Sequence, residues 1–174
     1  LKEAICKKFK RDNNLAYKPS QIVVSTGAKQ SLYNIAQVML NDGDEVILPA
    51  PYWVSYFEII KLSGGVPVEV PTSVESDFKI TPEQLEAAIT PKTKAIVPVH
   101  LFGQCADMER IMALAKKHNL FVIEDVAQAI GADYTFNDGT IRKAGTIGTI
   151  GCTSFFPSKN LGCYGDGGAI YTND

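Results

Sequence analysis

The segment SFFPSKN (154–160) places polar groups directly after an apolar run, and a glycine-rich stretch follows it. Ser154 brings a hydroxyl, Lys159 an amine and Asn160 an amide. An amine that is half removed from water loses part of its preference for the charged form and becomes a nucleophile. The segment could therefore hold a reactive lysine beside a ligand, although most lysines are ordinary surface cations.

A second group with chemical potential is the acidic pair in IEDVAQA (123–129), where an apolar run ends. Burying a carboxylate is costly unless a cation or hydrogen bonds compensate it. Asp125 could pair with a protonated ring nitrogen of a ligand, with Gln128 one helical step further on, or it could cap a helix. Glu124 should point to the opposite side of the strand, and we expect it to be structural.

Two more segments could contact a ligand. In STGAKQ, Gly27, Ala28 and Lys29 open a helix just after a strand. Unpaired N–H groups and the helix dipole favour an anion such as phosphate there, although the segment could also be a plain strand-to-helix turn. Trp53, the only tryptophan, follows another strand. Its flat ring could stack on a planar ligand, or it could belong to the core or an interface.

The elements that position these residues follow from the hydrophobic pattern. Seven apolar runs rich in β-forming residues span 21–26, 44–50, 66–71, 94–100, 120–126, 150–157 and 167–173. Most are continuous, which is typical of strands covered on both faces. Apolar residues at three- and four-residue spacing indicate helices between the first five runs. These helical patterns span 28–40, 52–64, 81–89 and 107–119.

Alternation of strands and helices predicts a largely parallel sheet with crossover helices. The last two strands differ, because the glycine-rich link 161–168 is too short to hold a helix. We therefore expect the seventh strand to run antiparallel to the sixth. The predicted fold is an α/β domain over 1–174, with three layers, α/β/α, around a mixed, mostly parallel seven-stranded sheet.

In an open α/β sheet, ligands bind beyond the carboxyl ends of the strands. The anion site, the aromatic ring, the carboxylate and the lysine all follow such strand ends. A phosphate anchor, a stacking ring, a partner for a ring nitrogen and a reactive amine together describe a pyridoxal phosphate site. Each signal is weak alone, and their joint placement is what favours this cofactor.

Composition excludes several classes of function. The chain has 174 residues, a formal net charge of −2 and 45% hydrophobic residues. This describes an ordinary soluble protein without the basic excess that nucleic acid or an anionic membrane would attract. No apolar stretch has the length of a membrane span, and the charged start LKEAICKKFK does not read as a signal peptide. We expect a cytoplasmic location.

The cysteines lack the short paired spacing of a zinc site and are too few for a disulfide framework. We expect reduced, mostly buried thiols and no metal. The four residues are Cys6, Cys105, Cys152 and Cys163.

The whole chain resembles the large domain of fold-type I pyridoxal phosphate enzymes, the aminotransferase superfamily. Residues 1–90, with STGAKQSLYNIAQVMLNDGDEVILPAPYWVSY, are similar to class I, aspartate-type aminotransferases. Residues 91–174, with HLFGQCADMERIMALAKKHNLFVIEDVAQAIGA and GCTSFFPSKNLGCYGDGGAIYTND, are similar to DegT-type sugar aminotransferases. Because the two halves resemble different branches, we expect an engineered chimera joined near ITPKTKAI (89–96). The implied fold is the large-domain core of the pyridoxal-phosphate-dependent transferases.

The resemblance implies roles around the cofactor ring. Lys159 would form the Schiff base and act as a base, and Asp125 would pair with the pyridinium nitrogen. Gln128 would contact the hydroxyl side of the ring, and Asn160 adjoins the lysine. Lys29 is a rival for the Schiff base by residue type alone.

The remaining implied contacts concern the phosphate and the ring face. Ser154 and the backbone at Ala28 and Lys29 would hold the phosphate, at the turn that Gly27 opens. Trp53 matches the stacking aromatic of the class I branch.

The implied activity is amino transfer between an amino acid and a keto acid or keto sugar, both small molecules, in a homodimer. The chain departs from class I enzymes where HLFGQ replaces their NPxNPTG motif. It also ends after the seventh strand, so we expect the small C-terminal domain to be absent.

Two alternatives remain. The chain could be a truncated or engineered chimeric domain that folds and binds pyridoxal phosphate without appreciable turnover. It could also be a Rossmann-like nucleotide binder, which is disfavoured because no GxGxxG follows the first strand.

Overall fold

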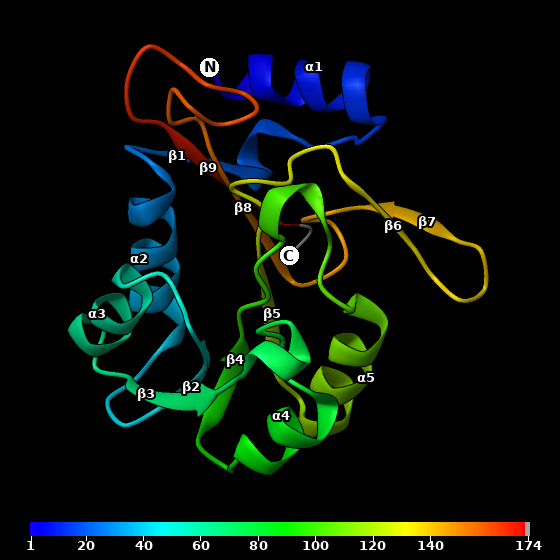
Figure 1. Ribbon diagram of the computed structural model, residues 1–174. Helices are drawn as coiled ribbons and strands as arrows, with labels where there is room; N and C mark the ends of the chain where they lie inside the picture. Colours follow the sequence, from blue (N-terminus) through cyan, green and yellow to red (C-terminus); the bar gives the residue numbers. More distant parts are fainter. Residues whose placement is uncertain (173–174) are drawn as a thin grey trace. The chain divides into compact units, whose positions relative to one another are not determined.

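A computed structural model describes residues 1–172 (Figure 1). Its internal contacts divide the chain into two compact units. Unit 1 comprises Leu1–Ser31, Pro98–Met108 and the chain from Ile123 onward, and unit 2 comprises Leu32–Val97 and Glu109–Val122. The assignment of 1–174 to a single domain stays a prediction.

Unit 1 contains the N-terminal helix and most of the short strands. Its elements are α1 (Lys2–Asn13), η1 (Pro19–Gln21), β1 (Ile22–Ser25), η3 (Leu101–Gly103), β6 (Asp133–Thr135), β7 (Ile141–Lys143), β8 (Ile150–Ser154) and β9 (Gly168–Thr172). The end of β5 (Phe121–Asp125) and the first turn of α2 (Ala28–Met39) also belong to it.

Unit 2 holds the strand and helix alternation of the middle of the chain. Its elements are β2 (Glu45–Ala50), α3 (Ser55–Leu62), β3 (Val66–Pro71), η2 (Val74–Ser76), α4 (Pro82–Ala88), β4 (Thr93–Ile96) and most of α5 (Met108–His118). Its core contains buried Val46, Leu48 and Ile60, against which Tyr56 and Phe57 pack.

The strands form a mixed seven-stranded sheet in the order β1-β9-β8-β5-β4-β2-β3, with helices on both sides. Strands β3, β2, β4, β5 and β8 pair in parallel, whereas β9 is antiparallel to both β8 and β1. The predicted α/β fold and the antiparallel seventh strand are therefore confirmed. The pattern had extended that strand to residue 173, which lies outside the described residues.

Two elements of unit 1 had no counterpart in the predicted pattern. The first is α1, an otherwise charged helix with Ile5 and Phe9 buried one turn apart. The helix ends at Asn13, and the next residue, Asn14, caps it with a left-handed φ of 53° and a backbone N–H that donates to the carbonyl of Phe9. The second is the antiparallel β6–β7 hairpin, in a separate two-stranded sheet.

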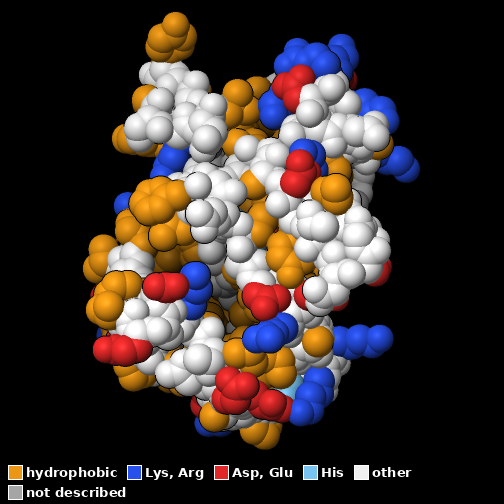
Figure 2. Space-filling view, turned by 45° about the vertical axis from the view of Figure 1, so that its right-hand side comes forward, with side chains coloured by type: hydrophobic (Ala, Val, Ile, Leu, Met, Phe, Trp, Pro, Cys, Tyr) orange, Lys and Arg blue, Asp and Glu red, His pale blue; other side chains and the backbone are white. Residues whose placement is uncertain are grey.

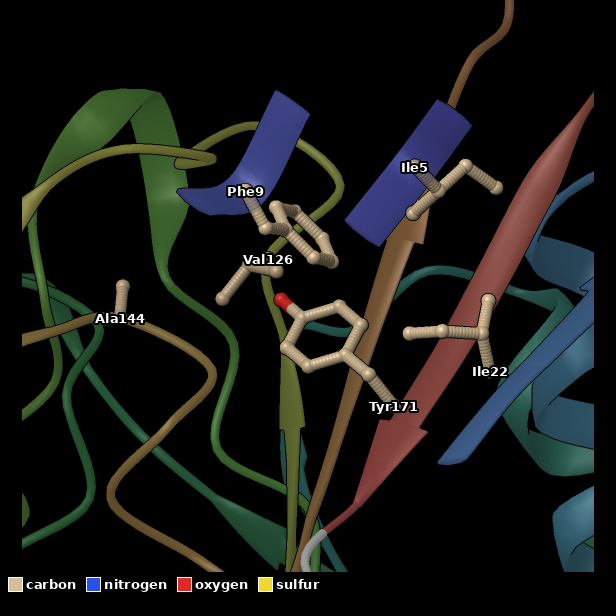
Figure 3. Packing of buried hydrophobic residues seen from close by; sticks show 6 residues of the cluster. All are labelled: Ile5, Phe9, Ile22, Val126, Ala144 and Tyr171. Atoms are coloured by element: carbon tan, nitrogen blue, oxygen red, sulfur yellow. The ribbon is translucent and has the colours of Figure 1, made fainter. Parts of the chain in front are cut away.

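The core of unit 1 joins α1 to the strands, as Figure 3 shows. Its buried members are Ile5, Phe9, Ile22, Val126, Ala144 and Tyr171. The rings of Phe9 and Tyr171 meet edge to face, with centroids 5.2 Å apart. Aromatic pairs in this geometry contribute beyond their buried area, so α1 is anchored to β9 by specific packing.

On the face drawn in Figure 2, several basic side chains lie close together at the upper right, and elsewhere acidic and basic side chains are mixed with apolar ones. This agrees with the formal net charge of −2. Within the described residues, no helix combines the length and hydropathy that a membrane crossing requires.

Candidate active site

Eight of the nine candidate residues lie in unit 1. They are Gly27, Ala28, Lys29, Asp125, Gln128, Ser154, Lys159 and Asn160. Trp53 lies in unit 2, where the residue is 44% exposed and its ring meets that of Tyr56 edge to face at a centroid distance of 5.4 Å. Its stacking on a ligand stays a prediction.

Asp125 ends β5 and is only 5% exposed. Its Oδ1 accepts the N–H of Ala127 at 2.9 Å, which fixes the side chain in a local turn. The main chain after Asp125 forms turns over 127–131 and not the helix that a cap at Asp125 would require. The helix-cap alternative is therefore wrong, because the carboxylate organises a turn instead.

Cys152 lies beside Asp125, its register partner on β8. Burial, together with the carboxylates of Asp125 and Glu124, raises the pKa of the Cys152 thiol far above its usual value. This thiol stays protonated and does not act as a nucleophile. All four cysteines are free, but only Cys152 is buried, so the expectation of mostly buried thiols is wrong.

Gln128 follows in the same turn and is half-buried. Its Oε1 accepts the N–H of Phe102 at 3.3 Å. Phe102 has a left-handed φ of 51° and is 81% exposed. The bond ties the turn after β5 to η3, and a primary amide whose oxygen accepts one bond still has two N–H groups that can donate.

Ser154 and the first turn of α2 lie on either side of Gly168. Ser154 pairs with Gly168 on β9, and Gly168 pairs with Ser25 on β1. Neighbouring strands are about 4.8 Å apart, so Ser154 and the turn after Ser25 are separated by roughly 10 Å, with only Gly168 between them. The helix N-terminus and the Ser154 hydroxyl thus flank one small residue.

Gly168 has to be glycine for this arrangement. A Cβ built on it would lie 2.6 Å from the backbone nitrogen of Ala28, closer than Cβ atoms approach backbone atoms. Gly27, with a φ of +97°, makes the turn itself. The first N–H groups of a helix lack intrahelical carbonyl partners, so the turn at Ala28 presents donors where a phosphate would fit.

Lys159 lies in a loop that is tied down at several points. Its N–H donates to the carbonyl of Phe156 at 2.8 Å, and the N–H of Phe156 donates to Ser154 Oγ at 3.2 Å. Phe155 bonds through its N–H to Gly167 and through its carbonyl to Cys163. These bonds hold the lysine loop between the end of β8 and the start of β9.

The side chain of Lys159 is half-buried, and among residues 1–172 none forms a hydrogen bond or ion pair with its amine. Asn160, the next residue, is exposed, as is Lys29 at the start of α2. Of the two lysines considered, Lys159 is therefore the more enclosed one.

Residues 13–174 match the family described as the DegT/DnrJ/EryC1/StrS aminotransferase family. The chain belongs to this family. Its members depend on pyridoxal 5'-phosphate. The residues present fit that cofactor, because the helix N-terminus that approaches Gly168 lies in the same unit as a buried carboxylate and a half-buried lysine.

Relatives of two kinds share the family resemblance. The UDP-2-acetamido-2-deoxy-3-oxo-D-glucuronate aminotransferase of Pseudomonas aeruginosa is 52% identical over 132 residues, which are 76% of this chain and 35% of that protein. The aspartate aminotransferase of Bacillus subtilis is 52% identical over 131 residues, 72% of this chain and 33% of that protein. The chain thus spans about a third of the length of these relatives.

Solved structures of aminotransferases are also similar to this chain. The aminotransferase from Psychrobacter cryohalolentis superposes with a TM-score of 0.81 at 37% identity, covering 99% of this chain and 41% of that one. A double mutant of Thermus thermophilus aspartate aminotransferase gives 0.78 at 30% identity, covering 98% and 46%. The similarity to both sugar and aspartate branches is confirmed, and the chimeric join near 89–96 stays a prediction.

Sequence reasoning missed two contributors to this site. Gly168 was part of a glycine-rich link with no role of its own, although a glycine that begins a strand indicates a close backbone approach. His100, to which the sequence analysis assigns no role, is completely buried. Its pairing with Glu124 at 2.9 Å has no signal in sequence spacing. No group of three or more candidate metal ligands occurs among the described residues.

Proposed function

We propose that the chain is the cofactor-binding core of a pyridoxal-phosphate-dependent aminotransferase, in which Lys159 is the Schiff-base residue. Its substrates would be an amino acid donor and a keto acid or keto sugar acceptor. The observation that supports this most is the row Ser154, Gly168 and Ser25, which sets a hydroxyl and a helix N-terminus around one glycine.

The cofactor, when bound, supplies an aldehyde that condenses with amines and a ring that accepts an electron pair from the substrate carbon. Ser154 and the N–H groups of Ala28 and Lys29 would bind the phosphate. Asp125 would hold a proton on the ring nitrogen, since a buried carboxylate is stabilised by a positive partner. Lys159 would remove and return the proton at the substrate α-carbon.

The turn that carries Gln128 would orient the other edge of the ring. Its carbonyl oxygen is already occupied by the Phe102 N–H, so its amide N–H groups are the ones that would face an oxygen of the ligand. Trp53 would stack on the ring face, and Asn160 would border the site beside Lys159.

The test is amino transfer from glutamate, measured as 2-oxoglutarate formed in the presence of pyridoxal phosphate and a panel of keto acids and keto sugars. Lys159→Ala should lower the rate by at least about 10²-fold, the contribution of a positioned base. Lys116→Ala, which removes an exposed lysine outside the candidate site, is the control and should keep the rate within a fewfold. Equal rates for Lys159→Ala and the unaltered chain would exclude the proposal.

A second candidate is a domain that binds the cofactor without appreciable turnover. The coverage of only 33% and 35% of the relatives' lengths favours it, because residues that grip the substrate can lie in the parts not matched. Cofactor binding without transfer from any donor supports this candidate. A homodimer is proposed for either case and is tested by light scattering after size exclusion.

A further inference from the structure

A fully buried carboxylate lies next to Asp125 along β5. Both oxygens of Glu124 are occupied by donors. Oε2 accepts His100 Nε2 at 2.9 Å and the Gly145 N–H at 2.7 Å. Oε1 accepts the N–H of Ile147 at 2.7 Å and that of Gly148 at 2.5 Å. Four donors around one carboxylate match the acceptor capacity of its ionised form.

His100 has a defined orientation and tautomer. Its Nδ1 accepts the N–H of Ala106 at 3.0 Å, so the ring proton sits on Nε2, which donates to Glu124. The backbone N–H of His100 donates to the carbonyl of Asp125 at 2.9 Å. The segment 98–106 is thus held to β5 by the side chain and the main chain of the same residue.

The turn that enters β8 is built around the same carboxylate. Gly145 has a φ of +83°, and a Cβ on it would lie 2.3 Å from the hydroxyl of Tyr171. A Cβ on Gly151, the register partner of Glu124, would lie 2.3 Å from the carbonyl oxygen of Gly145. Two glycines therefore leave the room that lets the turn at 145–148 reach Glu124.

The contacts of Glu124 connect to the candidate site in two places, at Asp125 and at strand β8. Asp125 is the next residue, and its N–H donates to the carbonyl of Pro98 at 2.9 Å. Strand β8 starts at Ile150, just after the tethered turn, and ends at Ser154, from which the Lys159 loop departs. One carboxylate thus restrains two of the strands whose ends carry candidate residues, β5 and β8.

We propose that Glu124 is a positioning residue of the site, acting through His100 and the 145–148 turn to fix Asp125 and the end of β8. The expected effect of Glu124 on cofactor binding rests on the proposed function. Alternate side chains of a strand point to opposite faces, so Glu124 acts from the face opposite Asp125 without touching the cofactor.

The test is Glu124→Gln. Glutamine keeps the shape but brings an N–H2 group toward donors, which leaves at least one buried N–H unpaired. Asp133→Asn is the matched control, because Asp133 is an exposed carboxylate of the same unit that pairs with Lys143. Two readouts are compared: amide hydrogen exchange of the cofactor-free chain by fragment, and pyridoxal phosphate affinity by absorbance titration.

Glu124→Gln should speed exchange in fragments 98–106, 145–148 and 154–160 by about tenfold and weaken cofactor affinity by about tenfold, the size expected for one unpaired buried donor. Asp133→Asn should leave both within twofold. An affinity within twofold of the unaltered chain would overturn the proposal. So would faster exchange spread evenly over unit 2 as well, since that pattern means a general loss of stability.

If Glu124→Gln does not fold, exchange of the unaltered chain decides. The amides of Ala106, Gly145, Ile147 and Gly148 should exchange at least tenfold more slowly than those of the hairpin loop 137–140. Equal rates overturn the proposal. An unaltered chain that binds no pyridoxal phosphate contradicts the proposed function alone, because the exchange pattern still tests whether Glu124 holds the two segments.

Discussion

At the scale of residues, Glu124 and Asp125 are chemically alike and adjacent, yet their surroundings give them different tasks. Glu124 is saturated by four donors and has no capacity left for a ligand. Asp125 accepts the N–H of Ala127 through Oδ1 and lies beside a thiol that burial keeps neutral. Asp125 is the one suited to a cationic ligand group.

Replacement of the Asp125 carboxylate by an amide should remove the anionic partner of the ring nitrogen. We expect Asp125→Asn to lower amino transfer by at least about 10²-fold, a typical loss when an acid–base partner is removed. The measurement is the initial rate with saturating pyridoxal phosphate. Unaltered rates in Asp125→Asn would show that this residue does not contact the cofactor.

Gly168 should be the least replaceable residue of the glycine-rich link. Its missing side chain leaves room for the Ala28 turn, whereas a Cβ on Gly165 would meet nothing within 4 Å. Gly168→Ala should weaken cofactor binding by about tenfold, the cost of a shift in backbone donors. Gly165→Ala should bind as the unaltered chain does, and similar affinities for the two variants would contradict the phosphate position.

At the scale of elements, the strands and the long helices were predictable because continuous apolar runs and helical spacing record burial on both faces of a sheet. The direction of β9 was predictable from the length of link 161–168 alone. Helix α1 was not predictable, because Ile5 and Phe9 are its only buried residues. Two residues are too few to give a recognisable apolar stripe. The β6–β7 hairpin is too short to give a strand pattern.

The attachment of α1 can be measured through Phe9, which is 2% exposed and packs on Tyr171. Phe9→Ala should lower the free energy of unfolding by about 3–5 kcal/mol through lost burial and a cavity. Val38 is 86% exposed on α2, so Val38→Ala should change the free energy of unfolding by less than about 0.5 kcal/mol. Urea unfolding measures both, and equal effects would contradict the packing of α1.

At the scale of the whole molecule, the buried side chains of Tyr171 and Cys152 should make the free energy of unfolding depend on pH. Burial raises the pKa of Tyr171 well above 10.0 and that of Cys152 above 9.0. Both are neutral when protonated, and in the unfolded chain they ionise at lower pH. The unfolded state therefore binds fewer protons above about pH 9, so folding becomes less favourable as the pH rises.

The contribution of Tyr171 and Cys152 to the free energy of unfolding should thus be constant below about pH 8. It should fall between about pH 9 and 11. Urea unfolding at intervals across this range measures the slope. Tyr171→Phe, which has no ionisable group, should flatten the alkaline part of the curve. An equally steep fall in Tyr171→Phe and Cys152→Ala would contradict the assignment.

The sequence indicated which kinds of residue belong to the candidate site, but not how they are arranged. Residue types after strand ends indicated an anion site, a carboxylate and a lysine, because the carboxyl ends of parallel strands share one edge. The role of Gly168 and the Glu124–His100 pair depend on pairing between residues far apart in the chain, which no local pattern encodes. The relation of Trp53 to the other candidates stays a prediction for the same reason.

The central claim is that pyridoxal phosphate bonds covalently to Lys159. The most direct measurement is borohydride reduction of the purified chain after incubation with the cofactor, followed by peptide mapping of the modified lysine. We predict one stable adduct, on Lys159, with loss of its absorbance in Lys159→Ala. Modification of Lys29, modification scattered over exposed lysines, or no adduct at all would contradict the account.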